Sequence, residues 1–221
     1  MTQLKEFLSA DEIGRGKKFR FEKDQDHFIV ARAALRDLLA GYLNCEPKEI
    51  TFSYGHNGKP FLKDEKIEFN VSHADHTALI GFSMDAPLGV DIEQVRSDIE
   101  FELVARHFFS PPEVKTLLAL DIYAQTQAFF YCWTRKESFI KALGDGLAFP
   151  LDQFEVSLLA SDEPLLKSTF WNPAEAQEWS LFSFEPDSIY IGESPTNVGA
   201  AAIRQKNIWV STYEWQFKLP G

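Results

Sequence analysis

Along the first forty residues, apolar side chains recur every three or four positions, the period of a helix buried on one face. Ser9 and Glu12 have the spacing of a capping box, which predicts a helix running toward Phe19. The apolar repeat over residues 28–42 predicts a second helix, and Gly41 is expected to end it. The start of the chain is therefore predicted to be helical.

From residue 50 the period shortens to two, which is typical of β-strands. Strands are predicted over residues 50–54, 67–71, 77–83 and 88–93. The last two are expected to form a hairpin through Met84–Pro87, and residues 55–60, G-H-N-G-K-P, read as a loop. This succession indicates an antiparallel sheet.

Near residue 97 the strand pattern gives way to a helical one. Phe101–Phe108 has helical spacing, Ser110 followed by two prolines and Glu113 marks a helix start, and a third helix is predicted over 125–143, ending at Gly144 and Gly146. Further strands are predicted over residues 154–159, 179–185, 197–203 and 209–215. Because helices and strands are grouped in each half and do not alternate, the prediction is an α+β fold with subdomains 1–97 and 98–221.

Composition agrees with a packed protein. The 221 residues include 20 phenylalanines and 5 tryptophans, enough for a substantial core without disulfides. Cys45 and Cys132 lack the paired spacing of a zinc site, and no signal peptide is recognised, so reduced thiols in a cytoplasmic protein are expected, with Cys132 in the core. No apolar stretch approaches about 18 residues, so no membrane span is expected.

The formal net charge of −11 argues against a nucleic-acid partner, because such proteins need a basic surface to neutralise phosphates. One segment is nevertheless basic, and it is followed by two arginines on a predicted helix. The side chains concerned are Arg15, Lys17, Lys18, Arg20, Lys23, Arg32 and Arg36. The pattern fits a small polyanionic ligand better than a polymer, and a solvated basic face is the alternative for any one of them.

Two acids share one face of the strand predicted over residues 88–93. Alternation places Val90 and Ile92 on one side and Asp91 and Glu93 on the other. A strand with its polar face in water has the same pattern. Because Gly89 has no side chain, another backbone or a ligand can approach the strand closely at this position.

A third acid lies in an apolar helix stripe. Glu137 falls between Trp133 and Lys141 at one-turn spacing, although a core-edge Glu paired with its i+4 Lys has the same pattern. Taken with Asp91 and Glu93, Glu137 completes a set of hard oxygen ligands suited to Mg²⁺, which commonly fills its shell with water and substrate phosphate.

Other polar residues are candidates for binding a ligand. Asn70-Val71-Ser72-His73 is expected to end a strand, and His73 has the chemistry to donate to a phosphate or to transfer a proton. A structural hydrogen bond is the alternative for His73, a turn start for Ser72, and an exposed turn lysine for Lys59, which lies in the glycine-rich loop.

Read in order, five segments resemble the Sfp-type 4'-phosphopantetheinyl transferases. They are G-K-P at 58–60, F-N-V-S-H at 69–73, L-G-V-D-I-E at 88–93, F-F-S at 108–110 and W-T-R-K-E-S-F-I-K-A at 133–142. The third and fifth are each of limited specificity, but together at this separation they are hard to obtain by chance. The resemblance extends from about residue 8 to residue 160.

The resemblance implies a fold of two similar, pseudo-twofold-related subdomains, with coenzyme A and a metal ion in the cleft between them. Asp91, Glu93 and Glu137 would hold Mg²⁺, or Mn²⁺, against the diphosphate of coenzyme A. Glu137, or a water it orients, is the candidate base for the attacking serine. Lys141 would bind the phosphates and stabilise the leaving group.

The resemblance also implies a coenzyme-binding set of Lys59, Ser72, His73, Arg32 and Lys141, with Arg15 and Lys18 as helpers around the 3'-phosphate. One departure concerns the N-terminus. Family members begin with a β-strand before the L-S-x-D-E helix, and residues 1–6 leave almost no room for it. The first strand is therefore expected to be missing, through a late start or a true loss.

The implied activity transfers the 4'-phosphopantetheine arm of coenzyme A to a serine of an apo acyl or peptidyl carrier protein, giving holo-carrier protein and 3',5'-ADP. Such a holo-[acyl-carrier-protein] synthase is expected to be a monomer that meets its carrier through an apolar patch and a few local basic groups. Phe108, Phe109 and the helix start at Ser110 are candidates for this patch, and core packing is the alternative for at least one of the phenylalanines. A catalytically inactive coenzyme A or carrier-binding module is the main alternative. A nucleotidyl or phosphoryl transferase is the other, although the chain has neither a P-loop nor a kinase signature.

Overall fold

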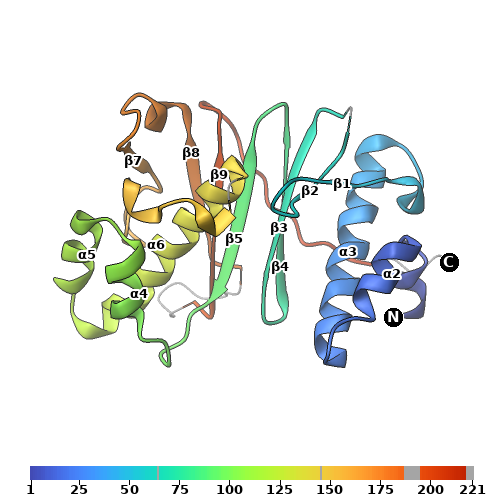
Figure 1. Cartoon of the computed structure of the whole chain (residues 1–221), viewed down its shortest axis with the longest axis horizontal. Coiled ribbons are helices and arrows are strands. Elements are labelled where there is room, and N and C mark those ends of the chain that lie inside the picture. The colour runs from blue at the N-terminus through green and yellow to red at the C-terminus, as the bar shows by residue number, and fades with distance from the viewer. Residues whose placement is uncertain (64, 145, 187–194, 218–221) are drawn as a thin grey trace. The chain divides into compact units, whose positions relative to one another are not determined.

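The computed structural model describes residues 1–63, 65–144, 146–186 and 195–217 (Figure 1). The chain forms two units. The first combines Met1–Ser53 with the terminal segment from Trp209, and the second comprises Tyr54–Ile208. Among the helices of the described residues, none is both long and apolar enough to cross a bilayer.

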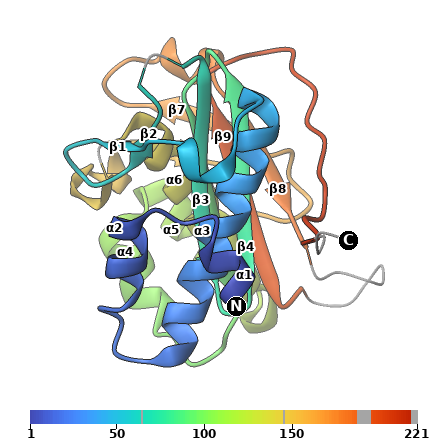
Figure 2. The same ribbon diagram turned by 90° about the vertical axis from the view of Figure 1, so that its right-hand side faces the viewer.

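Helices build the first unit (Figure 2). They are α1 (Thr2–Lys5), α2 (Ala10–Gly16), α3 (Glu22–Leu43) and a 3-10 turn, η1 (Pro47–Glu49). The capping box predicted at Ser9 and Glu12 opens α2, as expected. The end predicted for the second helix was wrong: α3 continues through Gly41 and ends where Asn44 turns left-handed, with φ 52°.

The terminal segment of the chain packs on these helices through side chains. Leu4, Leu8, Ile29 and Ala33 form a buried cluster, against which Trp215 packs. The indole nitrogen of Trp215 also donates to Asp37 Oδ2 at 2.8 Å. The strand predicted over residues 209–215 was wrong, because residues 209–217 are not in a β-ladder. Aromatic packing and a side-chain hydrogen bond hold this segment instead.

The second unit carries the sheets. Its strands are β3 (Ile67–Ala74), β4 (Thr77–Met84), β5 (Leu88–Gln94), β6 (Phe154–Val156), β7 (Leu166–Thr169), β8 (Ser180–Phe184) and β9 (Asn197–Ile203). Two short strands flank the glycine-rich loop, namely β1 (Ser53–Tyr54), whose first residue belongs to the first unit, and β2 (Pro60–Phe61). The helices of the second unit are α4 (Phe101–Phe108), α5 (Pro111–Leu118) and α6 (Ile122–Leu143), with 3-10 turns η2 (Gly146–Ala148), η3 (Leu151–Gln153) and η4 (Glu175–Glu178). The sheet orders are β1-β2, β3-β4, β5-β9-β8 and β6-β7.

Pairing differs from the predicted hairpin. β4 pairs with β3, and β5 pairs antiparallel with β9, so that Asp91 lies opposite Ala200. Ser83 and Ala86 do form a turn between β4 and β5, with a hydrogen bond of 2.5 Å. The predicted backbone pairing of residues 77–83 with 88–93 was therefore wrong, although the mixed helices and sheets agree with the expected α+β class.

The expected subdomain boundary near residue 97 falls between β5 and α4. Strands from both sides of it join in one sheet, because β5 precedes it and β8 and β9 follow it. The two compact units divide the chain elsewhere, at Ser53 and at Trp209. A description as two similar halves, 1–97 and 98–221, stays a prediction.

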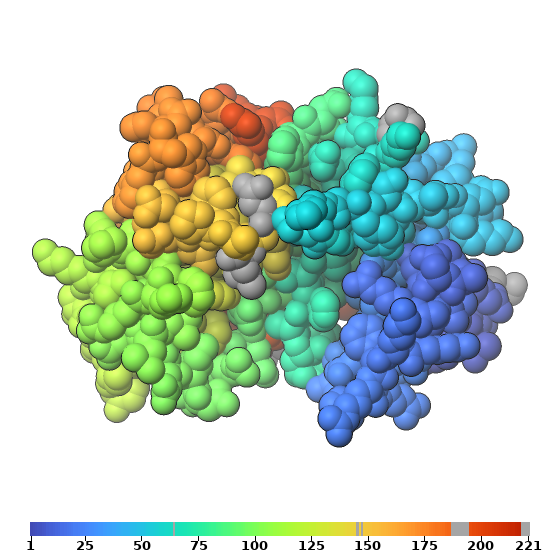
Figure 3. All heavy atoms as spheres, viewed as in Figure 1, coloured from blue at the N-terminus to red at the C-terminus, as the bar shows by residue number. Residues whose placement is uncertain are grey.

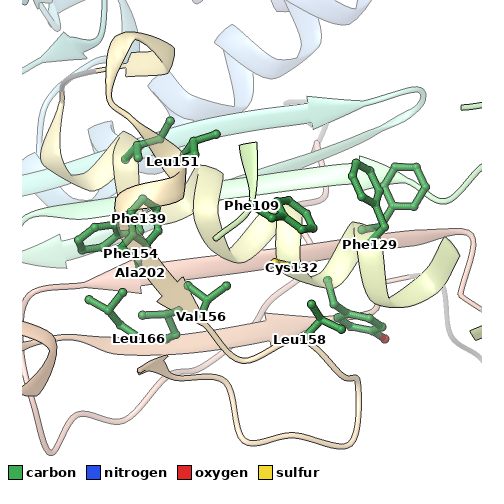
Figure 4. Packing of buried hydrophobic residues seen from close by; sticks show 14 of the residues in the cluster. Phe109, Phe129, Cys132, Phe139, Leu151, Phe154, Val156, Leu158, Leu166 and Ala202 are labelled. Carbon is green, nitrogen blue, oxygen red and sulfur yellow. The ribbon is translucent and has the colours of Figure 1, made fainter. Parts of the chain in front are cut away.

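Helix α6 lies across the sheet of β5, β9 and β8 and supplies much of the core (Figure 1). Phe129, Phe139 and Ile140 are almost fully buried, and Cys132 is buried with them, as predicted (Figure 4). Asp121 caps the start of α6 by accepting two backbone N–H groups, and Gly144, with φ 84°, ends it at the predicted position. The helix is thereby fixed at both ends.

Candidate active site

Helix α6 and strand β5 meet backbone to backbone at Gly89. A methyl group added there would lie 2.9 Å from the carbonyl carbon of Lys141, and closer still to the backbone atoms of Ser138 and Ala142. Only glycine leaves room for this contact. The close approach expected at Gly89 is thus made by another backbone, and it brings the acids of β5 next to the last turns of α6.

Three of the predicted site residues meet beside this contact. Lys141 Nζ, from α6, lies 2.5 Å from Asp91 Oδ1, on β5, and 3.0 Å from Ser72 Oγ, on β3. The Ser72 hydroxyl is also 3.0 Å from Asp91 Oδ1. Asp91 is only 3% exposed, while the Lys141 side chain keeps 29% of its surface in contact with solvent. A buried acid is therefore paired with a lysine that a ligand can reach.

The N-x-S segment of β3 links the two sheets through side chains. Val90 N donates to Asn70 Oδ1 at 2.8 Å, and Ile92 N approaches Ser72 Oγ at 3.4 Å. These two N–H groups point away from β9, so the β3 side chains satisfy donors that a neighbouring strand would otherwise receive. The turn considered for Ser72 is wrong, because β3 continues to Ala74 and Ser72 lies within it.

Sequence reasoning gave Asn70 no role of its own. The available signal was the period of two, which places Asn70 and Ser72 on the same side of the strand.

Burial governs the electrostatics of the acids. It raises the pKa of Glu137 to about 7, with further increases from Asp91 and Glu93 and an opposing effect of Lys141. Burial, and then Asp91, raise the pKa of Glu93. Burial also raises the pKa of Asp91, against the Lys141 ammonium and the Ser72 hydroxyl. Asp91 raises the pKa of both glutamates, and Glu93 raises that of Glu137, so a cation placed among these acids would be stabilised.

Two carboxylate oxygens at this place are buried without a hydrogen bond to any described residue, namely Asp91 Oδ2 and Glu137 Oε1. An unpaired buried carboxylate oxygen is costly unless a donor or a cation completes it. Mg²⁺ commonly takes one or two carboxylates and fills its shell with water and phosphate. Asp91 and Glu137 therefore have the donor atoms that Mg²⁺ requires.

Glu93 differs from the other two acids. Its pKa is raised by burial and by Asp91, and a hydrogen bond from the Trp133 side chain opposes this rise only in part. Within the described residues, no three His, Cys, Asp or Glu side chains are arranged around one metal position. Coordination of a metal ion by Asp91, Glu93 and Glu137 together stays a prediction. The evidence for a cation is that Asp91 Oδ2 and Glu137 Oε1 are buried without a hydrogen bond to a described residue.

Two further residues of the second unit that were predicted to bind coenzyme A, Lys59 and His73, lie outside the Asp91–Lys141–Ser72 cluster. Lys59 Nζ donates to two backbone carbonyls, of Leu88 at 3.0 Å and of Lys141 at 2.9 Å. His73 is exposed on β3, one residue beyond Ser72. Their contacts with coenzyme A stay predictions.

Arg15, Lys18 and Arg32 belong to the first unit. Lys18 is exposed, while the guanidinium groups of Arg15 and Arg32 each lie 5.7 Å from the centre of the Phe28 ring. Arg36 is buried and pairs with Glu12 at 2.7 Å, so it serves this unit's own structure. The coenzyme contacts predicted for the other three stay predictions.

Two basic residues beside Glu137 are structural. Lys136 is fully buried, pairs with Glu113 at 2.8 Å and donates to the Leu151 and Phe154 carbonyls. Arg135 donates to the Ser157 carbonyl at 2.8 Å. These two charged residues, which directly precede Glu137, thus anchor α6 to the segment that follows it. The sequence signal was their position inside an apolar stripe.

Comparison with known proteins matches both parts of the chain. Residues 87–198 match the family model described as the 4'-phosphopantetheinyl transferase superfamily, and residues 1–83 match one described as 4'-phosphopantetheinyl transferase, N-terminal. The 4'-phosphopantetheinyl transferase HetI of Nostoc sp. is 35% identical over 191 residues, which are 85% of this chain and 77% of HetI. Sfp of Bacillus subtilis is 34% identical over 153 residues, covering 69% of this chain and 67% of Sfp.

A solved structure, the holo-[acyl-carrier-protein] synthase of Thermotoga maritima, matches with a TM-score of 0.40 and 19% identity, covering 55% of this chain and 64% of that one. The family resemblance drawn from the five sequence segments is confirmed by the family models and by the two curated relatives. This chain belongs to the 4'-phosphopantetheinyl transferase family.

Proposed function

We propose that this chain transfers the 4'-phosphopantetheine arm of coenzyme A to a serine of an apo carrier protein. The serine oxygen forms a bond to the phosphorus that bears the pantetheine arm, and the bond from that phosphorus to 3',5'-ADP breaks. The serine proton passes to a base, and 3',5'-ADP departs with the electron pair. Membership of the family supports this reaction class.

The single observation that carries the proposal is the meeting of Asp91, Lys141 and Ser72 next to Glu137. Three elements of the second unit contribute these side chains, and all of them lie in the segments by which the family was recognised. A charged lysine held beside buried carboxylates suits the binding of a phosphate whose charge a cation balances.

Each residue receives a role. Asp91 and Glu137 are the proposed Mg²⁺ ligands, with Glu93 as a third candidate, and the ion would reduce the charge repulsion between the diphosphate and the nucleophile. Glu137, or a water bound to it, accepts the serine proton, because burial raises its pKa to about 7, a value suited to a base. Lys141 binds the phosphates of coenzyme A.

The finer specificity is also a proposal. We infer activity on acyl carriers, as in a holo-[acyl-carrier-protein] synthase, and on peptidyl carriers. Ser72, His73, Arg15, Lys18 and Arg32 are proposed to contribute to coenzyme binding, whereas the bonds of Lys59 to two backbone carbonyls favour a different role for this residue.

The test mixes the whole protein with coenzyme A, Mg²⁺ and apo-carrier, and measures the mass of the intact carrier. An increase by one phosphopantetheine is expected, and a carrier whose acceptor serine is replaced by alanine is the control. Acyl and peptidyl carriers are compared side by side. Coenzyme binding without transfer to any of them would instead support the inactive binding module, and chelation of the metal should stop the reaction.

A further inference from the structure

The glycine-rich loop at residues 55–60 carries a lysine whose ammonium group points inward. Lys59 Nζ donates to the carbonyl oxygens of Lys141 at 2.9 Å and of Leu88 at 3.0 Å. Burial lowers the pKa of Lys59, and Glu68 opposes this effect. Two of its three donors are thus engaged by backbone carbonyls of other elements.

The same loop meets the end of α6 a second time. Asn57 Nδ2 donates to the Gly144 carbonyl at 2.9 Å. The last turn of a helix leaves carbonyl groups without a donor from the helix itself, and a cation there also complements the helix dipole. Figure 3 shows the loop, in teal, against the yellow segment around the end of α6. The loop therefore supplies a C-terminal cap from more than eighty residues away in sequence.

The loop is shaped for this role by its own hydrogen bonds. Gly58 N donates to the Gly55 carbonyl, and Gly55 N donates to the Lys59 carbonyl, both at 2.9 Å. Gly58 has φ 77°, a left-handed conformation that glycine adopts without strain. These two backbone hydrogen bonds fix the conformation of the loop, and so the positions from which Asn57 and Lys59 contact α6.

One ammonium group joins the two elements that carry the site. Leu88 is the first residue of β5, which bears Asp91, and Lys141 belongs to the last turn of α6. Lys59 holds the backbone of Lys141, while Asp91 and Ser72 hold its side chain. The backbone and the ammonium of Lys141 are therefore fixed by different groups.

We propose that Lys59 and Asn57 are positioning residues for Lys141, and that the loop at residues 55–60 caps α6 and sets it against β5. The kinetic part of this inference rests on the proposed function. It differs from the family-based expectation that Lys59 grips a phosphate of coenzyme A. A phosphate ligand contributes chiefly to coenzyme affinity, whereas a positioning residue contributes chiefly to the rate of the bound complex.

The kinetic test compares Lys59→Met with Lys63→Met, which removes the same charge from an exposed position four residues away. In Lys59→Met we expect kcat to fall about tenfold or more, since a hydrogen-bonded charged group is lost, with the KM for coenzyme A changed less than about twofold. Lys59→Arg should restore part of the rate, and Asn57→Ala should lower kcat by a smaller factor. Lys63→Met should behave as the wild-type protein.

Two results would overturn the proposal. One is a rise of about tenfold in the KM and the dissociation constant for coenzyme A with kcat unchanged, which would make Lys59 a phosphate ligand. The other is a Lys59→Met variant with both constants unchanged. Should Lys59→Met not fold, Lys59→Arg gives the comparison of kcat with the KM for coenzyme A, and Asn57→Ala at its exposed position tests the cap.

Amide hydrogen exchange tests the cap without any enzymatic activity. In the whole protein, the amides of the last turn of α6 should exchange several times faster in Lys59→Met and Asn57→Ala, and at the wild-type rate in Lys63→Met. If the wild-type protein transfers no phosphopantetheine, the proposed function is wrong. The exchange rates would still show whether the loop caps α6. Unchanged exchange in Lys59→Met overturns the cap itself.

Discussion

Replacing Gly89 by alanine tests the contact on which the whole site depends. The added methyl group would lie 2.9 Å from the Lys141 carbonyl carbon, and nearer to the Ser138 carbonyl oxygen and the Ala142 nitrogen. These are backbone atoms of a helix, so no side chain can rotate away. The methyl group is accommodated only if α6 and β5 separate.

The loss of unfolding free energy in Gly89→Ala can be estimated from the cost of overpacking a core, which is typically about 1–3 kcal/mol. Because α6 packs on the sheet through a large buried surface, we expect Gly89→Ala to lie at the upper end, at about 3 kcal/mol of lost unfolding free energy. For a chain of this size that corresponds to a fall of roughly 6–12 °C in Tm. Urea denaturation and thermal unfolding, each followed by circular dichroism, measure the two quantities.

Two other glycines provide matched controls. A methyl group at Gly81 would meet the side-chain ends of Val90 and Leu88, which can shift, so Gly81→Ala should cost about 1 kcal/mol. Gly41 lies inside α3 with nothing within 4 Å, so Gly41→Ala should stabilise by about 0.5–1 kcal/mol. A Gly89→Ala protein as stable as the wild type would refute the close packing of α6 on β5.

Further predictions concern the acids, the buried ion pair and the link between the sheets. Asp91→Ala and Glu137→Ala should each abolish phosphopantetheine transfer while circular dichroism shows a folded protein, and near-normal turnover in either variant would remove that residue from the mechanism. Glu113→Ala leaves Lys136 charged and buried, so the unfolding free energy should fall by about 3–5 kcal/mol, whereas the double change Glu113→Leu with Lys136→Met should recover most of it; equal losses in both would contradict this account. Asn70→Ala leaves Val90 N without its acceptor and should cost about 1–3 kcal/mol in urea denaturation, and a loss below about 0.5 kcal/mol would show that this bond is dispensable.

Sequence patterns predicted the elements whose limits are set locally. The limits of β9 agree with the predicted range, α4 lies where helical spacing was found, and α5 begins at the predicted cap, where Ser110 accepts from Glu113 N. Asp91 and Glu137 were also placed together from the sequence, because alternation and helical spacing each fix one side chain's direction, and the family resemblance supplied their partnership. Local rules were therefore sufficient for the elements, whereas the pairing of the two acids also needed the resemblance.

Contacts between residues far apart in the sequence could not be predicted from these local patterns. The predicted hairpin of β4 with β5 failed because β5 pairs with β9, more than a hundred residues later. The strand predicted at residues 209–215 failed because only Trp215 packs there, on helices, while Trp209 and Tyr213 are exposed. Lys59 could be read as a ligand residue or as a surface residue, and only the fold reveals the two carbonyls that it meets.

The N-x-S segment of β3 both links the two sheets and contributes to the candidate active site, and Ser72 Oγ takes part in both. Where β3 runs beside β5, Asn70 and Ser72 receive the β5 N–H groups that a backbone ladder would otherwise engage. The hydroxyl of Ser72 is also the group that contacts Asp91 and Lys141. A continuous ladder would satisfy β5 equally well, but it would leave no hydroxyl to hold the ion pair. The break between the two sheets is therefore what allows the fold to place a polar group inside the site.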